Sequence, residues 1–215
     1  MSQPVIEKVR RFAEAHFGED ASGHDWWHVH RVWRTARALA EAEGADRTVV
    51  EIAALLHDVA DWKLAEQGEE AGLRTLRELL AGELPEETIE HIGDIVKGVS
   101  YKGAGVDTPM ATLEGRVVQD ADRLDALGAV GIARAFAYGG SRGRLIHDPA
   151  QPPVLHASFE EYKNNRGPST NHFYEKLLLL KDRMQTVTGK TWAEERHRFM
   201  EDFLEQFFRE WDGVR

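Results

Sequence analysis

The sequence predicts an all-α protein, folded as a single bundle of about ten helices over residues 1–215. Apolar residues recur at the spacing of an amphipathic helix along most of the chain. No segment convincingly shows the alternation of apolar and polar residues that indicates a half-buried β-strand. With 42% hydrophobic and 30% charged residues, the composition is typical of a globular protein. Its 215 residues are enough for one domain with a buried core.

The first helices are predicted from their apolar stripes and from the residues at their ends. One spans about residues 4–17 and ends at Gly18. The next begins after Asp25, which is a typical N-cap residue, and ends before Gly44. A third helix begins after Asp46. The stripe of the second helix consists of Val29, Val32, Trp33, Ala36, Leu39 and Ala40.

The same periodicity predicts five more helices, at residues 69–80, 85–99, 109–138, 172–188 and 192–211. The helix that begins at residue 109 contains Gly128, where we expect a bend. Two connecting segments without helical period are expected to be loops. These are residues 100–107 and the longer stretch 139–153, which is rich in glycine and proline.

The composition excludes several classes of function. The chain has no cysteine, which excludes disulfides, thiolate zinc sites, iron–sulfur clusters and a cysteine nucleophile. The net charge of −10 disfavours binding to duplex nucleic acid, although a small nucleotide remains compatible with it. No secretory signal is visible in residues 1–18, and no apolar run is long enough to span a membrane. We therefore expect a cytoplasmic protein that does not associate with membranes.

Histidine and aspartate residues gather at three places, each beside the apolar stripe of a predicted helix. These clusters are His24, His28 and His30; His57, Asp58 and Asp61; and Asp120, Asp122 and Asp125. Each cluster alone has an ordinary explanation, since a lone histidine is often a hydrogen-bonded core residue and an acidic run is often solvated. Nitrogen and oxygen ligands from adjacent helices are, however, the arrangement that holds a divalent metal inside a helical bundle.

Helical geometry selects among the histidines. His28 lies one turn before Val32 and therefore points toward the edge of the core. His24 shares that face if the helix extends so far, whereas His30 points elsewhere. His57 and Asp61 are four residues apart and lie on one face of their helix.

Asp120 falls on the apolar stripe with Val117 and Leu124. A carboxylate buried at such a position requires a cation or hydrogen bonds. The sequence alone leaves both possibilities open.

Several segments of the chain together resemble the HD superfamily of metal-dependent phosphohydrolases, and within it a group of small, stand-alone bacterial HD proteins. They are GHDWWHVHRV, HDVADWK, VSYKG, DADRLDALGAVGIAR, FYEKLLLLKDRM and WAEERHRFMEDFL. The resemblance implies an all-helical fold with the metal between the central helices. Carried over residue by residue, it implies that the metal ligands are His28, His57, Asp58 and Asp122.

The resemblance also implies a residue that transfers a proton or orients water three positions after the HD aspartate, which is Asp61 here. Basic residues near the site are expected to bind the substrate phosphates. Arg123, next to Asp122, is the first candidate, and Lys102 and Lys63 are the next. Two histidines and two carboxylates suit one divalent ion, with Mn²⁺, Mg²⁺, Co²⁺, Ni²⁺ and Fe²⁺ all compatible.

The expected function is metal-dependent hydrolysis of a small nucleotide, and cleavage of nucleoside triphosphates to monophosphate and pyrophosphate is the most specific hypothesis. A nucleoside monophosphate phosphatase or a cyclic-nucleotide phosphodiesterase is the alternative chemistry. The chain lacks the GYP tripeptide of the cyclic-di-nucleotide phosphodiesterases, which disfavours that branch. An alternative of another class is a non-catalytic ligand-binding domain that is stabilised by its metal. The sequence leaves the oligomeric state open.

Overall fold

The computed structural model describes residues 2–18, 25–59, 69–101, 106–155, 160–161 and 166–214. Within these ranges the structure has nine α-helices, two short 3₁₀ helices and no strand. This confirms the predicted all-α class. None of the described helices is both long enough and apolar enough to cross a membrane.

The first five helices follow the sequence prediction closely. They are α1 (Ser2–Phe17), α2 (Trp26–Glu43), α3 (Arg47–Leu56), α4 (Glu69–Leu80) and α5 (Glu86–Val99). Asp25 caps α2, because its side chain accepts a hydrogen bond from the backbone N–H of His28 at 2.9 Å. Gly44 ends α2 with a positive φ of 75°, a conformation that glycine adopts without strain.

The long helix predicted from residue 109 to Tyr138 is wrong, because the chain forms two helices there. These are α6 (Leu113–Asp125) and α7 (Gly128–Ser141). The side chain of Thr112 accepts a hydrogen bond from the N–H of Gly115 and thereby starts α6 later than predicted. Gly128 has a φ of 68°, so the chain changes direction at this residue instead of bending within one helix.

The loop predicted at residues 139–153 also starts later than expected, because α7 continues through Ser141. The chain then lacks helix from residue 142 to residue 155. The guanidinium groups of Arg142 and Arg144 lie 5.5 and 5.6 Å from the centre of the Tyr138 ring. Cation–π contacts of this kind hold the start of the loop against the last turns of α7.

The C-terminal region differs from the two helices predicted at residues 172–188 and 192–211. It consists of α9 (Asn171–Glu175), the 3₁₀ helices η1 (Leu177–Leu179) and η2 (Lys181–Arg183), and α10 (Val187–Trp211). Asp120 accepts hydrogen bonds from the N–H groups of Gln185 and Thr186 and so fixes an extended turn before α10. Thr186 caps the new helix, which then runs without a break to Trp211.

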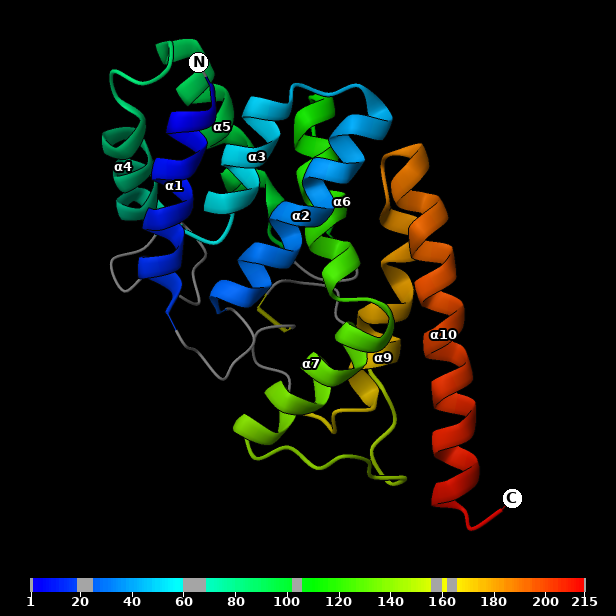
Figure 1. Ribbon diagram of the computed structural model, residues 1–215. Coiled ribbons are helices and arrows are strands. Elements are labelled where there is room, and N and C mark those ends of the chain that lie inside the picture. Colours follow the sequence, from blue (N-terminus) through cyan, green and yellow to red (C-terminus); the bar gives the residue numbers. More distant parts are fainter. Residues whose placement is uncertain are drawn as a thin grey trace.

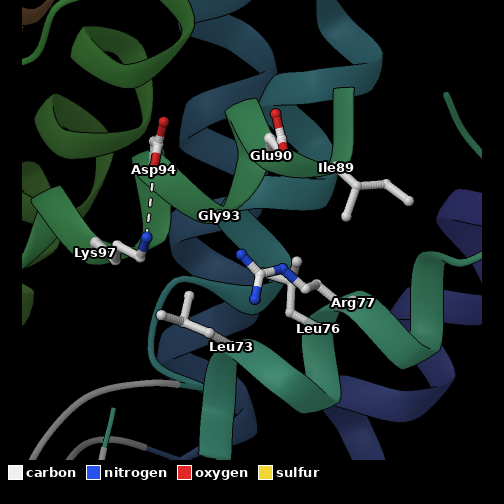
Figure 2. A pocket seen from close by; sticks show the side chains of 8 residues that line it. All are labelled: Leu73, Leu76, Arg77, Ile89, Glu90, Gly93, Asp94 and Lys97. Atoms are coloured by element: carbon white, nitrogen blue, oxygen red, sulfur yellow. Dashed lines mark ion pairs between the residues drawn. The ribbon is translucent and has the colours of Figure 1, made fainter. Parts of the chain in front are cut away.

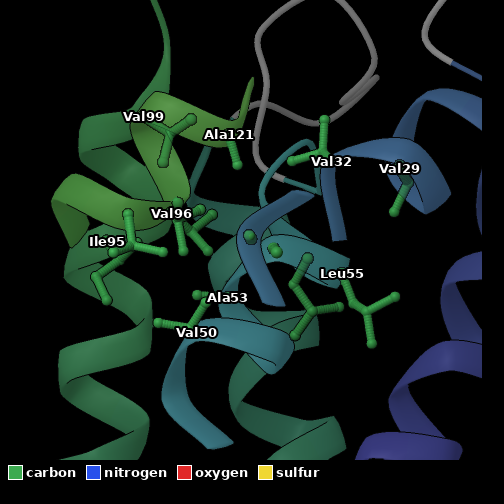
Figure 3. Close-up of a cluster of buried hydrophobic side chains, with 14 of the residues drawn as sticks. Val29, Val32, Val50, Ala53, Leu55, Ile95, Val96, Val99 and Ala121 are labelled. Atoms are coloured by element: carbon green, nitrogen blue, oxygen red, sulfur yellow. The ribbon is translucent and has the colours of Figure 1, made fainter. Parts of the chain in front are cut away.

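Helices α2, α3 and α6 form the centre of the molecule (Figure 1). Helices α1, α4 and α5 cover one side of this centre, and α10 packs along the opposite side against α2, α6 and α7. The core lies where α2, α3, α5 and α6 meet, and Figure 3 shows its valine, leucine, isoleucine and alanine side chains interdigitating. Because α2 packs most extensively against α6 and α3, polar residues on these three helices are brought together.

Candidate metal centre

The structure brings His28, His57, Asp58 and Asp122 together. His28 lies in the first turn of α2, His57 and Asp58 follow the last residue of α3, and Asp122 lies in the last turn of α6. The Nε2 atoms of His28 and His57 are 3.2 Å apart. Carboxylate oxygens of Asp58 lie 3.4 Å from both nitrogens. An oxygen of Asp122 lies 3.5 Å from His28 Nε2 and 3.8 Å from His57 Nε2.

The hydrogen bonds of the two histidines fix which ring nitrogen carries a proton. His57 Nδ1 lies 2.8 Å from the carbonyl oxygen of Ala54, which can only accept, so Nδ1 carries the proton. His28 Nδ1 lies 2.7 Å from a carboxylate oxygen of Asp125 and carries a proton for the same reason. In the neutral rings both Nε2 atoms therefore present lone pairs, and these face each other at 3.2 Å. A cation between them would turn this repulsion into attraction.

This donor set fits a divalent metal ion. Neighbouring ligand atoms that each lie about 2.1 Å from an ion are roughly 3 Å apart in an octahedral arrangement. The separations of 3.2 to 3.8 Å between these nitrogens and oxygens are close to that value. Two neutral imidazoles and two carboxylates also balance the charge of such an ion, and mixed nitrogen and oxygen ligands suit several first-row metals and Mg²⁺.

The electrostatics of His28 point to a positive charge at the same place. Complete burial and the charge of Arg134 act to lower the pKa of His28, but its hydrogen bonds to Asp125 and Asp58 outweigh them. The resulting pKa is about 9. In the metal-free protein a proton would thus be held among the carboxylates, and this proton takes the place of the positive charge that a metal would bring.

Asp125 is a member of the site to which the sequence analysis gave no role. It is buried, and it accepts hydrogen bonds from His28 Nδ1 at 2.7 Å, Arg31 Nε at 2.7 Å and Arg134 Nη1 at 2.8 Å. Burial acts to raise the pKa of Asp125, but the hydrogen bonds from His28 and Arg31 hold it well below its usual range. Asp125 therefore stays ionised and fixes the ring of His28 through the nitrogen that faces away from the metal centre.

One signal in the sequence could have indicated this role. Asp125 lies three residues after Asp122, so both point to the same side of α6. A carboxylate placed behind a metal-binding histidine is a common arrangement. Its other partners, Arg31 and Arg134, come from α2 and α7, and no short sequence pattern connects them with Asp125.

The chain resembles known proteins over most of its length. The HD domain family model matches residues 26–127, which include all four residues of the centre. Bacillus subtilis YpgQ, an uncharacterized protein, is 36% identical over 210 residues, covering 97% of this chain and 94% of YpgQ. The chain belongs to the HD superfamily. The HD pair of this member is His57 and Asp58, and it lies where α3 ends.

Two solved structures resemble the whole chain. The crystal structure of an HD-superfamily hydrolase from Bacillus thuringiensis is 48% identical, with a TM-score of 0.78 and 99% of both chains covered. The crystal structure of Bacillus subtilis YpgQ in complex with ADP is 33% identical, also with a TM-score of 0.78, and covers 97% of this chain and 96% of that one. The likeness therefore extends beyond the residues matched by the HD model.

Two other residues named in the sequence analysis lie apart from the HD centre. Asp120 is fully buried, and hydrogen bonds rather than a cation satisfy it, because its carboxylate accepts from Gln185 and Thr186. Burial raises its pKa, and these hydrogen bonds act against that rise. His30 packs against Trp27 and Trp33, with ring centres 5.8 Å away in both cases, and points away from the centre as predicted.

The predicted phosphate-binding residues are only partly described. Arg123 is buried, its Nη1 donates to the carbonyl oxygen of Arg183, and its Nη2 donates to Thr108 Oγ1 at 3.0 Å. Both amino groups are thus bonded to the protein, and the role of Arg123 toward a substrate stays a prediction. Four other residues of the sequence analysis lie outside the described residues, namely His24, Asp61, Lys63 and Lys102. The roles predicted for Asp61, Lys63 and Lys102 therefore stay predictions as well.

A separate pocket lies between α4 and α5 (Figure 2). Apolar residues of both helices line it together with two cations, Arg77 and Lys97, and two anions, Glu90 and Asp94. Lys97 forms an ion pair with Asp94 at 3.5 Å. The pocket contains none of the metal-centre residues and its charges balance, so we assign it no part in the site.

Proposed function

We propose that this protein is a metal-dependent phosphohydrolase that cleaves nucleoside triphosphates to nucleoside monophosphate and pyrophosphate. The observation that carries the proposal is the pair of imidazole Nε2 atoms 3.2 Å apart, flanked by the carboxylates of Asp58 and Asp122. Membership of the HD superfamily supports the hydrolytic chemistry. The structure of the relative YpgQ in complex with ADP supports a nucleotide as the ligand.

His28, His57, Asp58 and Asp122 would hold one divalent ion, which supplies Lewis acidity toward a phosphoryl group and toward the attacking water. Three of these side chains are buried, with exposed fractions of 1%, 1% and 7% for His28, His57 and Asp58. The side chain of Asp122 is 26% exposed. The substrate would therefore approach the centre from the side of Asp122.

In the proposed reaction, the oxygen of water forms a bond with the α-phosphorus of the nucleotide. The bond between that phosphorus and the oxygen bridging to the β-phosphorus breaks, and pyrophosphate leaves. The attacking water loses a proton, which Asp61 would accept. Arg123, Lys102 and Lys63 would offset the negative charge of the phosphates during the displacement.

The test is a screen of nucleotides with the purified protein in the presence of Mn²⁺, Mg²⁺, Co²⁺, Ni²⁺ or Fe²⁺, in which phosphate and pyrophosphate are measured separately. The proposal requires equal amounts of monophosphate and pyrophosphate from a triphosphate. Release of phosphate alone from monophosphates, or opening of a cyclic nucleotide, would replace it with one of the alternative chemistries. No turnover with any metal, combined with a large loss of thermal stability in chelator, would indicate a non-catalytic domain stabilised by its metal.

A further inference from the structure

Two cations from separate segments lie over one aromatic ring. The ring of Tyr101, which follows α5, has the Nζ of Lys176 at 4.9 Å from its centre and the guanidinium carbon of Arg183 at 5.2 Å. Lys176 follows α9, and Arg183 ends η2. Tyr101, Lys176 and Arg183 are half-buried, so each can still be reached from solvent.

Arg123 connects this group to the metal centre. Its Nη1 donates to the backbone oxygen of Arg183, and its neighbour in sequence is the ligand Asp122. Arg123 therefore connects the two cations on the Tyr101 ring with the end of α6 that carries Asp122.

This arrangement favours an anionic ligand. Lys176 and Arg183 both lie over the ring of Tyr101, and Arg123 contacts the backbone of Arg183, so the three side chains bring positive charges close together. The Nε of Arg123 is buried and has no hydrogen-bond partner. Cations held close together on an aromatic ring and on backbone oxygens are poised for a ligand with more than one negative charge, because such a ligand relieves their repulsion.

The charge of the metal centre indicates which part of a nucleotide would bind here. Asp58 and Asp122 already balance the charge of a divalent ion, so little positive charge would remain for a triphosphate. A group of cations beyond Asp122 would lie on the path of the phosphates that follow the one at the metal.

We propose that Tyr101, Lys176 and Arg183 form a subsite that binds the two terminal phosphates of a nucleoside triphosphate, the pair that leaves as pyrophosphate. This inference rests on the proposed function and makes it more specific, since the subsite selects triphosphates over monophosphates. Arg123 supports the subsite by holding the backbone of Arg183 in place.

The experiment compares Lys176→Met and Arg183→Gln with the wild type in the metal-loaded protein. Isothermal titration calorimetry at a constant free metal concentration measures binding of inorganic pyrophosphate, of a non-hydrolysable nucleoside triphosphate analogue and of a nucleoside monophosphate. Each substitution is expected to weaken binding of the first two ligands by about 10- to 100-fold, the usual effect of losing a charged hydrogen-bond donor. Binding of the monophosphate and the metal content should change by less than about twofold.

Lys190→Met is the matched control, because it removes the same charge from an exposed position in the first turn of α10. It should bind pyrophosphate as the wild type does. Melting curves of all variants show whether each is folded, and Arg183→Gln keeps a group that can donate to the carbonyl oxygen of Val106, as Arg183 does now.

The results separate this inference from the proposed function. Unchanged affinity for pyrophosphate in both folded variants, while the wild type releases pyrophosphate from triphosphates, would overturn the subsite and leave the function standing. Weaker pyrophosphate binding in the variants of a protein that hydrolyses no triphosphate would retain the anion site and overturn the function. An equal loss for monophosphate and pyrophosphate would also contradict the inference, because it would indicate a general disturbance of the site.

Discussion

Asp125 accepts hydrogen bonds from His28 Nδ1, Arg31 Nε and Arg134 Nη1, and it is the residue of the candidate metal centre to which no motif of the sequence assigned a role. Asp125→Asn keeps the shape of the side chain but removes the charge that fixes His28 and pairs with Arg31. We expect metal affinity to fall by about 10- to 100-fold, as is usual for a partner behind a metal ligand. A metal titration of the purified protein measures it.

Asp94→Asn is the control for this prediction, because it removes a carboxylate charge at a position of α5 whose side chain is 77% exposed. It should bind metal as the wild type does. Equal metal affinity in Asp125→Asn and the wild type would show that the carboxylate does not act through His28.

At the scale of single residues, sequence reasoning succeeds where one helix or a family motif carries the signal. The structure brings together the four residues predicted as ligands, and it turns His30 away from them. Sequence reasoning does not reveal which contacts a side chain makes with elements that are distant in the sequence. Arg123 is adjacent to Asp122 in sequence, yet its amino groups are bonded to η2 and to Thr108, which only the tertiary structure could show.

Helix ends in this protein were predictable where a local cap determines them, as at Asp25 and Gly44. Helix ends were not predictable where a residue far away in the sequence determines them. The start of α10 depends on Asp120, which accepts from the backbone 65 and 66 residues later. The apolar period continues across Gly128, so it does not reveal the break that extended Leu127 and the positive φ of Gly128 make between α6 and α7.

The break at Gly128 provides a test at the level of elements. A Cβ added there would occupy a backbone conformation that L-residues disfavour and would lie 3.2 Å from the side chain of Arg196. We expect Gly128→Ala to reduce the free energy of unfolding by about 1–2 kcal/mol, measured by urea denaturation. Gly140→Ala is the control, since a Cβ at this helical position meets nothing within 4 Å. It should leave the free energy unchanged or raise it by up to about 1 kcal/mol. A stable Gly128→Ala would mean that the chain can continue from α6 into α7 without the break.

The contact between the end of α2 and the start of α10 should depend on pH. Glu43 accepts a hydrogen bond from the N–H of Thr188 at 2.6 Å, and this contact holds the pKa of Glu43 below its ordinary value. A lowered pKa in the folded state stabilises the protein above the unfolded pKa, and this contribution is lost as pH falls through the folded pKa. We expect Glu43→Gln to lower the free energy of unfolding by about 0.3–1 kcal/mol at pH 7, the usual effect of a charge at a helix N-terminus.

The difference between Glu43→Gln and the wild type should shrink as the pH falls below about 4, where Glu43 takes up its proton. Urea denaturation at several pH values between 7 and 3 measures it. Glu41→Gln removes the same charge from an exposed position in the same helix, and its effect should stay below about 0.5 kcal/mol. A difference that stays constant with pH would show that the ionised carboxylate contributes nothing to the contact.

For the whole molecule, the metal centre and the core depend on the same three helices. His28, His57 and Asp122 come from α2, the end of α3 and α6, which also meet in the apolar core. An ion held by all three would therefore bind the folded chain much more tightly than the unfolded one. Folding and metal binding should accordingly be linked across the whole molecule.

This linkage predicts that a chelator lowers the melting temperature of the wild-type protein. Metal at about 100 times its dissociation constant adds about 2.7 kcal/mol to the free energy of unfolding. In a chain of this size that corresponds to roughly 5–10 °C, which differential scanning calorimetry with and without chelator measures.

His57→Ala removes one of four ligands, so it should lose stoichiometric metal after dialysis and show no response to chelator. His30→Ala leaves the centre intact and should respond as the wild type does, because its ring packs against Trp27 and Trp33 instead. If His57→Ala kept its metal and its chelator response, the HD pair would not hold the ion, because this variant has lost the imidazole nitrogen and gained no other ligand.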